Sequence, residues 1–234
     1  MARRPRVRAR GARIILTVVL AVLVVGGLVL VAYFTPLMSV RSTDIRGNKV
    51  VSGEQIGEVA AVATGTPLLQ VDTEAVARRV AAIPQVESAR VQRGYPSTLT
   101  VTVVERTPVA LVREGDRVHV LDRSGVGYLT LVAAQAPAAI TRLPVFHTST
   151  PGPADPTTKA ALGVVASLPA DLRGQILTVT ASSPVDIEFG LRRDRTVIWG
   201  DDSRTADKAR TLGYLLTRRA SEYNVSSPDF PAYR

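Results

Sequence analysis

The sequence predicts an α+β protein in which one transmembrane helix precedes two external modules. Three observations support this prediction. A long run near the start is apolar and uncharged, whereas later segments either alternate like strands or repeat with helical spacing. Hydrophobic residues make up 46% of the 234 residues, enough for the cores of one or two domains. The first module has the order β-α-α-β-β, and the second is expected to be a mixed antiparallel β domain with helices.

The apolar run IILTVVLAVLVVGGLVLVAYF covers residues 14–34. As a helix it would be roughly 30 Å long, the thickness of a bilayer core. Residues 1–13 contain six arginines and no acid, which predicts a cytoplasmic basic tail. A cleaved signal peptide has a shorter apolar region and an A-x-A site, so an uncleaved anchor is favoured. The expected topology is single-pass type II, with both modules outside the cell membrane.

Charge and cysteine content exclude several classes of function. The net charge is +9, but the six arginines of the tail leave only +3 for the rest of the chain. A nucleic-acid-binding protein more often carries its basic residues on a folded face, so no nucleic-acid partner is expected. The chain has no cysteine, which excludes a disulfide framework, a thiol nucleophile and a cysteine-ligated metal.

The first module is predicted over residues 38–107, with two helices in its middle. Ser52 begins the first helix, with Gln55 three residues later as in a capping box. Gly65 is the predicted stop signal of that helix. Asp72 is a good N-cap for the second helix, and Pro84 ends it.

Strands of this module are predicted at residues 40–46, 87–93 and 98–105. The alternation in the last strand predicts an inward face formed by Leu99, Val101 and Val103. Glu105 and Arg106 follow that strand. They are interpreted as the exit of the module, with Arg106 bonding a neighbouring carboxylate or carbonyl, because Pro108 cannot continue a ladder. A catalytic carboxylate would need a second acid or a base nearby, and the local sequence supplies neither.

The second module is predicted over residues 108–226. Short strands are expected within residues 109–132, and a helix over 157–168 ends before Pro169. Three further strands are predicted at residues 175–182, 185–190 and 195–200. They are followed by a helix over 204–219 that is capped by Asp202, a last short strand at 222–226 and a tail at 227–234.

The segments IRGNKVVS, TPLLQVD and IPQVESARVQRGYPSTLTVTVVERTPVAL follow the predicted anchor. Together with that anchor they resemble the FtsQ/DivIB family of bacterial cell-division proteins. LP near 143, WGD at 199–201 and NVSSP at 224–228 are similar to landmarks of the family. The resemblance covers nearly the whole chain and implies that the first module is a POTRA domain. One departure is Asn224, where similar members usually carry Asp.

The resemblance implies a non-enzymatic scaffold of the division septum that needs no cofactor. Its implied partners are FtsB/DivIC-like and FtsL-like bitopic proteins and, through them, septal peptidoglycan synthases, with membrane lipid around the anchor. Family members bind a bitopic partner through their final strands, and an exposed sheet edge can accept such a strand. The expected partner contacts are Tyr223, Asn224, Val225 and Ser226, flanked by Trp199 and Tyr214.

Two questions about this site stay open from the sequence. The four residues 223–226 either contact a partner or form a strand that closes the core. Phe230 and Tyr233 lie on a tail with two prolines, which is either disordered or covers the edge strand until a partner arrives.

Other chemistry has little support. His119 and His147 are the two histidines, whereas a metal site needs three or four convergent ligands. Asp201 and Asp202 could bind magnesium, but their place before a helix favours capping. Lys208 is expected to be a solvated or paired helix residue. The alternatives are a POTRA-containing component of a secretion or envelope-assembly system and an anchored cell-wall enzyme.

Overall fold

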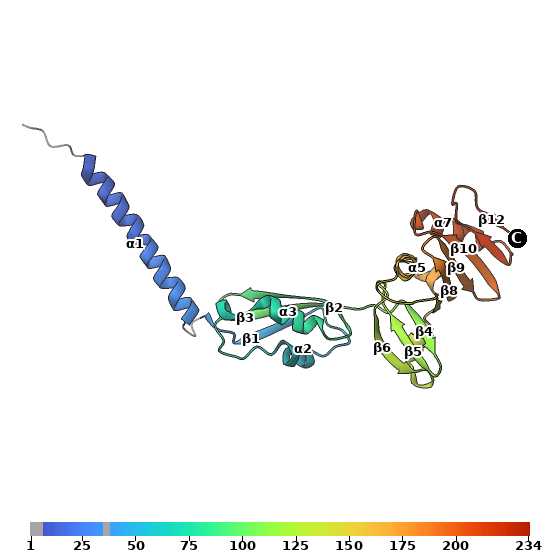
Figure 1. Cartoon of the computed structure of the whole chain (residues 1–234), viewed down its shortest axis with the longest axis horizontal. Helices are drawn as coiled ribbons and strands as arrows, with labels where there is room; N and C mark the ends of the chain where they lie inside the picture. Colours follow the sequence, from blue (N-terminus) through green and yellow to red (C-terminus); the bar gives the residue numbers. More distant parts are fainter. Residues whose placement is uncertain (1–6, 35–37) are drawn as a thin grey trace, which may run out of the picture. The chain divides into compact units, whose positions relative to one another are not determined.

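The computed structural model describes residues 7–34 and 38–234 and separates into two compact units (Figure 1). The first unit ends at Glu105, and the second begins at Arg106. The sequence predicted a border two residues later, after Thr107.

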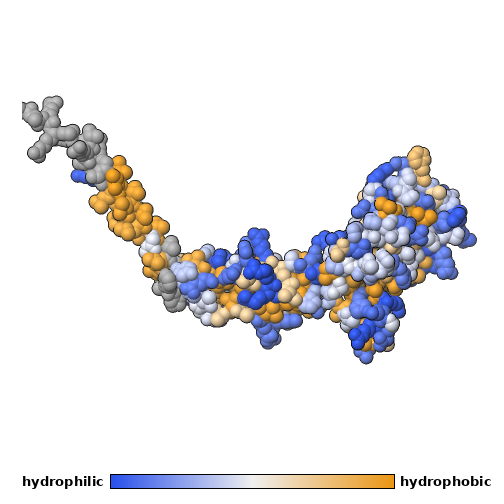
Figure 2. All heavy atoms as spheres, viewed as in Figure 1, coloured by the Kyte–Doolittle hydropathy of each residue, from blue (hydrophilic) through white to orange (hydrophobic). Residues whose placement is uncertain are grey.

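Helix α1 (Val7–Phe34) is continuous over the predicted transmembrane run and begins inside the predicted basic tail. Residues 1–6 of that tail lie outside the described residues. Large apolar side chains along α1 are exposed, among them Ile15 and Leu23, and the helix is mostly orange in Figure 2. In the part of the chain that the structure describes, no helix combines the length and apolar character needed to cross a membrane. The predicted transmembrane helix is therefore not confirmed.

The first unit also contains a three-stranded sheet with two helices on one face. Its elements are β1 (Ser42–Arg46), α2 (Gly53–Ala60), η2 (Leu68–Gln70), α3 (Thr73–Ala81), β2 (Val86–Gly94) and β3 (Thr98–Glu105). The strand order is β1-β3-β2, with β1 parallel and β2 antiparallel to β3. The predicted order β-α-α-β-β is confirmed. The predicted inward residues of β3 are buried against the helices, at 0% for Leu99 and Val101 and 2% for Val103.

Local signals begin both helices of this sheet as predicted. Ser52 Oγ accepts a hydrogen bond from Gln55 N–H at 3.1 Å, and Asp72 Oδ1 accepts from Ala75 N–H at 2.9 Å. The end of α2 differs from the prediction, because Ala61 adopts a left-handed conformation with φ 49°. Its N–H bonds the last turn of the helix, which closes α2 before Gly65 is reached.

The second unit is built on a nine-stranded mixed sheet. Its strands are β4 (Ala110–Glu114), β5 (Arg117–Leu121), β6 (Gly127–Val132), β7 (Val145–His147), β8 (Ile176–Ser183), β9 (Asp186–Leu191), β10 (Arg195–Gly200), β11 (Glu222–Asn224) and β12 (Ala232–Tyr233). Its helices are η3 (Ala133–Gln135), α4 (Ala138–Thr141), α5 (Pro156–Ser167), α6 (Ala170–Arg173) and α7 (Thr205–Leu215). The strand order is β12-β11-β10-β9-β8-β7-β4-β5-β6. Pairs β4–β7, β7–β8 and β10–β11 are parallel, and the other neighbours are antiparallel.

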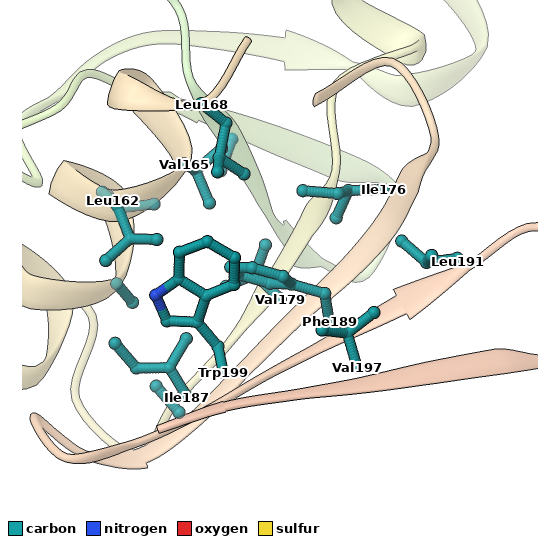
Figure 3. Packing of buried hydrophobic residues seen from close by; sticks show 14 of the residues in the cluster. Leu162, Val165, Leu168, Ile176, Val179, Ile187, Phe189, Leu191, Val197 and Trp199 are labelled. Carbon is teal, nitrogen blue, oxygen red and sulfur yellow. The ribbon is translucent and has the colours of Figure 1, made fainter. Parts of the chain in front are cut away.

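The core of this unit lies between α5 and the sheet (Figure 3). Trp199 and Phe189 are completely buried there, with their ring centroids 5.3 Å apart. Leu162 and Val165 of α5 face the same cluster (Figure 3). Burying aromatic side chains of this size contributes much of the stability of a small domain.

Helix α7 begins differently from the prediction. Its N-cap residue is Arg204, which has φ 49° and makes no side-chain cap. The prediction that Asp202 caps this helix is wrong, since only its carbonyl oxygen is used, accepting from Thr205 Oγ1 at 2.8 Å. The Asp201 carboxylate instead bonds Ser203 at its N–H (3.1 Å) and Oγ (2.6 Å), so a turn separates the acidic pair from the helix.

Candidate partner-binding edge

Strand β11 lies near one end of the nine-stranded sheet, between β10 and β12. It runs parallel to β10, with Tyr223 opposite Val197. Val225 N–H donates to Ile198 O at 3.0 Å across this pair. Successive residues of a strand direct their backbone groups to opposite sides. The N–H and C=O groups of Glu222 and Asn224 therefore face away from β10.

Three of the predicted contact residues have no exposed side chain. Tyr223, Val225 and Trp199 each have 0% relative exposure. The Tyr223 hydroxyl donates to Arg218 O at 2.8 Å, so even its polar end is occupied. These side chains close the core, which is the alternative that the sequence left open for residues 223–226. These three side chains are therefore not available to a partner while the unit is folded.

The remaining predicted contacts lie at the surface. Asn224 is half-buried and Ser226 is exposed. Asn224 Oδ1 accepts from Ser226 N–H at 3.0 Å and from its Oγ at 2.7 Å, a local turn that ends the strand. Tyr214 is 64% exposed on α7, where Arg218 lies 5.8 Å from its ring centroid. The structure thus brings Asn224 and Ser226 together at the edge, whereas the side chain of Tyr214 points to solvent from a helix.

The outward backbone groups of β11 are occupied by β12. Glu222 N–H donates to Arg234 O, and Arg234 N–H donates to Glu222 O, both at 3.0 Å. Asn224 pairs with Ala232 in the same antiparallel ladder. The predicted tail, residues 227–234, therefore supplies a strand of the sheet, and we call these residues the tail segment.

Two ion pairs attach the tail segment to the rest of the unit. Arg204 donates to both carboxylate oxygens of Asp229, at 2.6 and 2.9 Å, and it also contacts Asp207 at 3.3 Å. This bidentate contact lowers the pKa of Asp229 and raises the pKa of Arg204. At the other end of β12, Arg234 Nη2 lies 2.8 Å from Glu222 Oε2.

A buried lysine fixes the turn between β10 and α7. Lys208 has 1% relative exposure and donates to Asp201 O at 2.9 Å and to Asp201 Oδ1 at 2.5 Å. Its ammonium group lies 6.0 Å from the ring centroid of Trp199. The hydrogen bond from Lys208, together with the bond from Ser203, lowers the pKa of Asp201 to about 2.

Gly200 allows this turn to approach β11 closely. It adopts φ +79°, and an added Cβ would lie 2.9 Å from Ser226 Cβ. A side chain at this position would be strained by the backbone and by the contact together. The end of β10, the start of α7 and the end of β11 are therefore packed around one glycine and one lysine.

The Glu105–Arg106 pair has a structural role in each unit, as predicted. Glu105 Oε1 accepts from the amides of Lys49, Val50 and Val51 at 2.9, 3.0 and 2.9 Å. Burial would raise the pKa of Glu105, but these bonds outweigh it and lower the pKa.

Within the second unit, Arg106 forms the predicted pair with a carboxylate, that of Asp122. Asp122 is 1% exposed and also accepts from the N–H groups of Ser124 and Val126. Burial acts to raise the pKa of Asp122, and its hydrogen bonds lower it overall. All acceptor oxygens of this carboxylate are thus used for structure.

The histidines serve no common site among the described residues. His119 Nδ1 lies 2.9 Å from Thr130 Oγ1, and its Nε2 lies 3.1 Å from Glu114 Oε2. His147 ends strand β7. Over residues 7–34 and 38–234, no cluster of three or more acidic or histidine side chains could hold a metal ion.

Sequence reasoning missed Arg204 and Asp229, the residues that attach the tail segment. The two lie 25 positions apart. No local pattern pairs them, because Arg204 stands in a turn rather than on the predicted helix and Asp229 stands between two prolines. The contacts at residues 223–226 were predicted from the family resemblance together with the strand-like pattern of residues 222–226.

The chain is similar to known proteins over nearly its whole length. A family model described as POTRA domain, FtsQ-type, matches residues 38–106. The "Cell division protein FtsQ" of Mycolicibacterium smegmatis is 44% identical over 230 residues, which cover 98% of this chain and 67% of that protein.

Two further relatives carry the same name. The protein of Mycobacteroides abscessus is 46% identical over 229 residues, covering 98% of this chain and 72% of the relative. The protein of Streptomyces venezuelae is 32% identical over 237 residues, which cover 98% of this chain and 87% of that relative. The similarity therefore includes both units and extends beyond the POTRA domain.

Proposed function

Because the chain belongs to the FtsQ/DivIB family of bacterial cell-division proteins, we propose that it is a membrane-anchored scaffold of the division septum. Like its family, it is a non-enzymatic component of the cell-division machinery. Its work is to bind and order FtsB/DivIC-like and FtsL-like bitopic proteins. Through these partners it is linked to septal peptidoglycan synthesis.

One observation carries the binding proposal: the sheet of the second unit ends at β11 and the two-residue β12. Strand addition requires backbone N–H and C=O groups that a neighbouring chain can reach. Glu222 and Asn224 direct such groups away from β10, and among the described residues the short strand β12 of the tail segment pairs with them. The site is therefore proposed at the backbone of residues 222–226, with Asn224 and Ser226 as the surface side chains.

The anchor is proposed from the uncharged residues 14–34 and from the exposed apolar side chains of α1. Such side chains are stable when lipid covers them. Confinement of two single-pass proteins in one membrane raises their effective concentration, so that a short strand contact is sufficient for binding. The basic residues 1–13 place the N-terminus in the cytoplasm under this proposal.

The test has two parts, localisation and contact. A fluorescent fusion is expected at the septum, and depletion is expected to give filamentous cells that lack septa. A photo-cross-linking residue at Ser226 is expected to capture a bitopic division protein in living cells. The matched control is the same residue at Val185, which is 68% exposed in the turn between β8 and β9. Equal capture at both positions, or normal division after depletion, would refute the proposal.

A further inference from the structure

The tail segment occupies the backbone groups that the proposed partner strand needs. Ser221 N–H and Glu222 N–H both donate to Arg234 O, at 2.8 and 3.0 Å. Asn224 pairs with Ala232. A strand from another chain cannot form a ladder on β11 while these bonds exist. Binding at this edge therefore requires either exchange of β12 or pairing on the far side of β12.

The far side of β12 is a poor template. In an antiparallel ladder the backbone groups alternate in direction. Since Arg234 and Ala232 face β11, the residues that face outward are Tyr233 and Pro231. Proline has no N–H, so this side offers a single donor, that of Tyr233. Proline on an edge strand is a common means of preventing further strand addition. The geometry favours exchange.

The contacts of β12 are suited to exchange. Both residues of the strand are exposed, and Tyr233 and Phe230 are 52% and 86% exposed. The tail segment therefore adds little apolar burial, which is the main source of stability in a fold. Its attachment depends on a short ladder and on ion pairs at two points, Arg204–Asp229 and Arg234–Glu222.

The residue that holds Asp229 has an unusual backbone. Arg204 has φ 49°, in the left-handed region that residues with a Cβ seldom adopt. At this position its guanidinium reaches both Asp207 of its own helix and Asp229 of the tail segment. When the tail segment leaves, Arg204 keeps Asp207 but loses its bidentate partner. Glu222 loses Arg234 at the same time.

We propose that the tail segment is an internal competitor for the partner strand, attached by the Arg204–Asp229 pair and displaced when the partner binds. The inference rests on the proposed function, since it concerns the same edge. The expected partner is an extended segment antiparallel to β11. It carries an acidic residue that reaches Arg204 and, five positions later, a basic residue that reaches Glu222, as Asp229 and Arg234 do.

The direct test uses the tail as its own probe. A labelled synthetic peptide of residues 227–234 is titrated into the full chain and into a variant that stops after Ser226, both in detergent. The truncated variant is expected to bind the peptide. The full chain is expected to bind at least about tenfold more weakly, because the attached segment competes at a high effective concentration.

Two point variants isolate the ion pair. Asp229→Asn, which weakens the attachment, is expected to bind the peptide more tightly than the unchanged chain does. Asp207→Asn removes the other carboxylate on Arg204 and leaves the tail intact, so it is expected to bind no more tightly than the unchanged chain. Equal peptide binding by the full and truncated chains would overturn the inference. A truncated chain that is unfolded, or that is folded and does not bind, would also overturn it.

The Ser226 cross-linking assay separates this inference from the proposed function. If the truncated chain captures a division partner better than the full chain, both stand. If the two capture it equally, the edge is the partner site but the tail segment is not its competitor. If neither captures a partner, the proposed site itself fails.

Discussion

The helix starts of the first unit and the last two strands of the second unit are fixed by contacts of different range along the chain. In the first unit, Ser52 and Asp72 begin the helices by binding amides two or three residues away. In the second unit, the last two strands depend on Lys208–Asp201 and on Arg204–Asp229, which are 7 and 25 residues apart. Short-range signals thus specify these helix starts, whereas the candidate binding edge is assembled by side chains that meet only after folding.

The largest expected effect is at the buried face of β11. Tyr223→Lys places a charge where the side chain has no exposure. It is expected to cost about 4 kcal/mol or more and to unfold the second unit while the first stays folded. Hydrogen exchange of amides from each unit would measure this. Because of this burial, a partner-binding test that replaces Tyr223 and Val225 with lysine cannot leave the fold intact.

The matched control for this prediction is Tyr214→Lys. Tyr214 is 64% exposed, so the substitution is expected to change the free energy of unfolding by less than about 0.5 kcal/mol. Similar exchange rates in the two variants would contradict the burial of β11 against the core.

The next largest effect on stability is expected from substitution of Lys208. Lys208→Ala removes a buried side chain and leaves the carbonyl oxygen and Oδ1 of Asp201 without this donor. A loss of about 2–3 kcal/mol is expected, less than for a fully buried pair because the Asp201 side chain is 41% exposed. Lys208→Met keeps most of the volume and is expected to lose less. If both variants lost the same stability, the charge alone would explain the effect, and packing against Trp199 would contribute nothing.

A smaller effect is expected at the acidic residues that precede two helices, Asp72 before α3 and Asp202 before α7. Asp72→Ala removes a cap that accepts from Glu74 and Ala75 amides and is expected to cost about 1 kcal/mol. Asp202→Ala is expected to be nearly neutral, because the Asp202 side chain does not cap α7. Thermal unfolding of both variants would measure the difference. A larger loss at Asp202 would restore the capping role that the sequence suggested.

The smallest expected effect is the acid sensitivity of the turn at Asp201. The pKa of this carboxyl falls from 3.8 to about 2 on folding, chiefly through the Lys208 hydrogen bond. Its contribution to stability is present above the unfolded value of 3.8 and is lost as the pH falls toward 2. Asp201→Asn is expected to weaken the dependence of the free energy of unfolding on pH between about pH 2 and pH 4. An unchanged slope would show that the bond does not form in solution.

Much of the fold could be predicted from periodicity and caps. Strand β3 has its predicted bounds, and Asp72 caps α3 as expected. The end of α2 could not be predicted, because a left-handed Ala61 closes it and alanine carries no signal for that conformation. At the candidate site, the pattern predicted a strand at residues 222–226. It could not tell whether Tyr223 faces a partner or the core, because an apolar side chain suits both.

The elements with local causes could be predicted from the residues alone: the helix starts at Ser52 and Asp72, the alternating strand 98–105 and the β-α-α-β-β order of the first unit. The pairing of the tail segment with β11 and the contact between Arg204 and Asp229 are visible only in the folded chain. The two groups of features differ in how far apart along the chain the contacting residues lie. A cap or an alternating face depends on neighbours within a few residues, whereas a strand edge and an ion pair across 25 positions exist only when the core has brought both partners together.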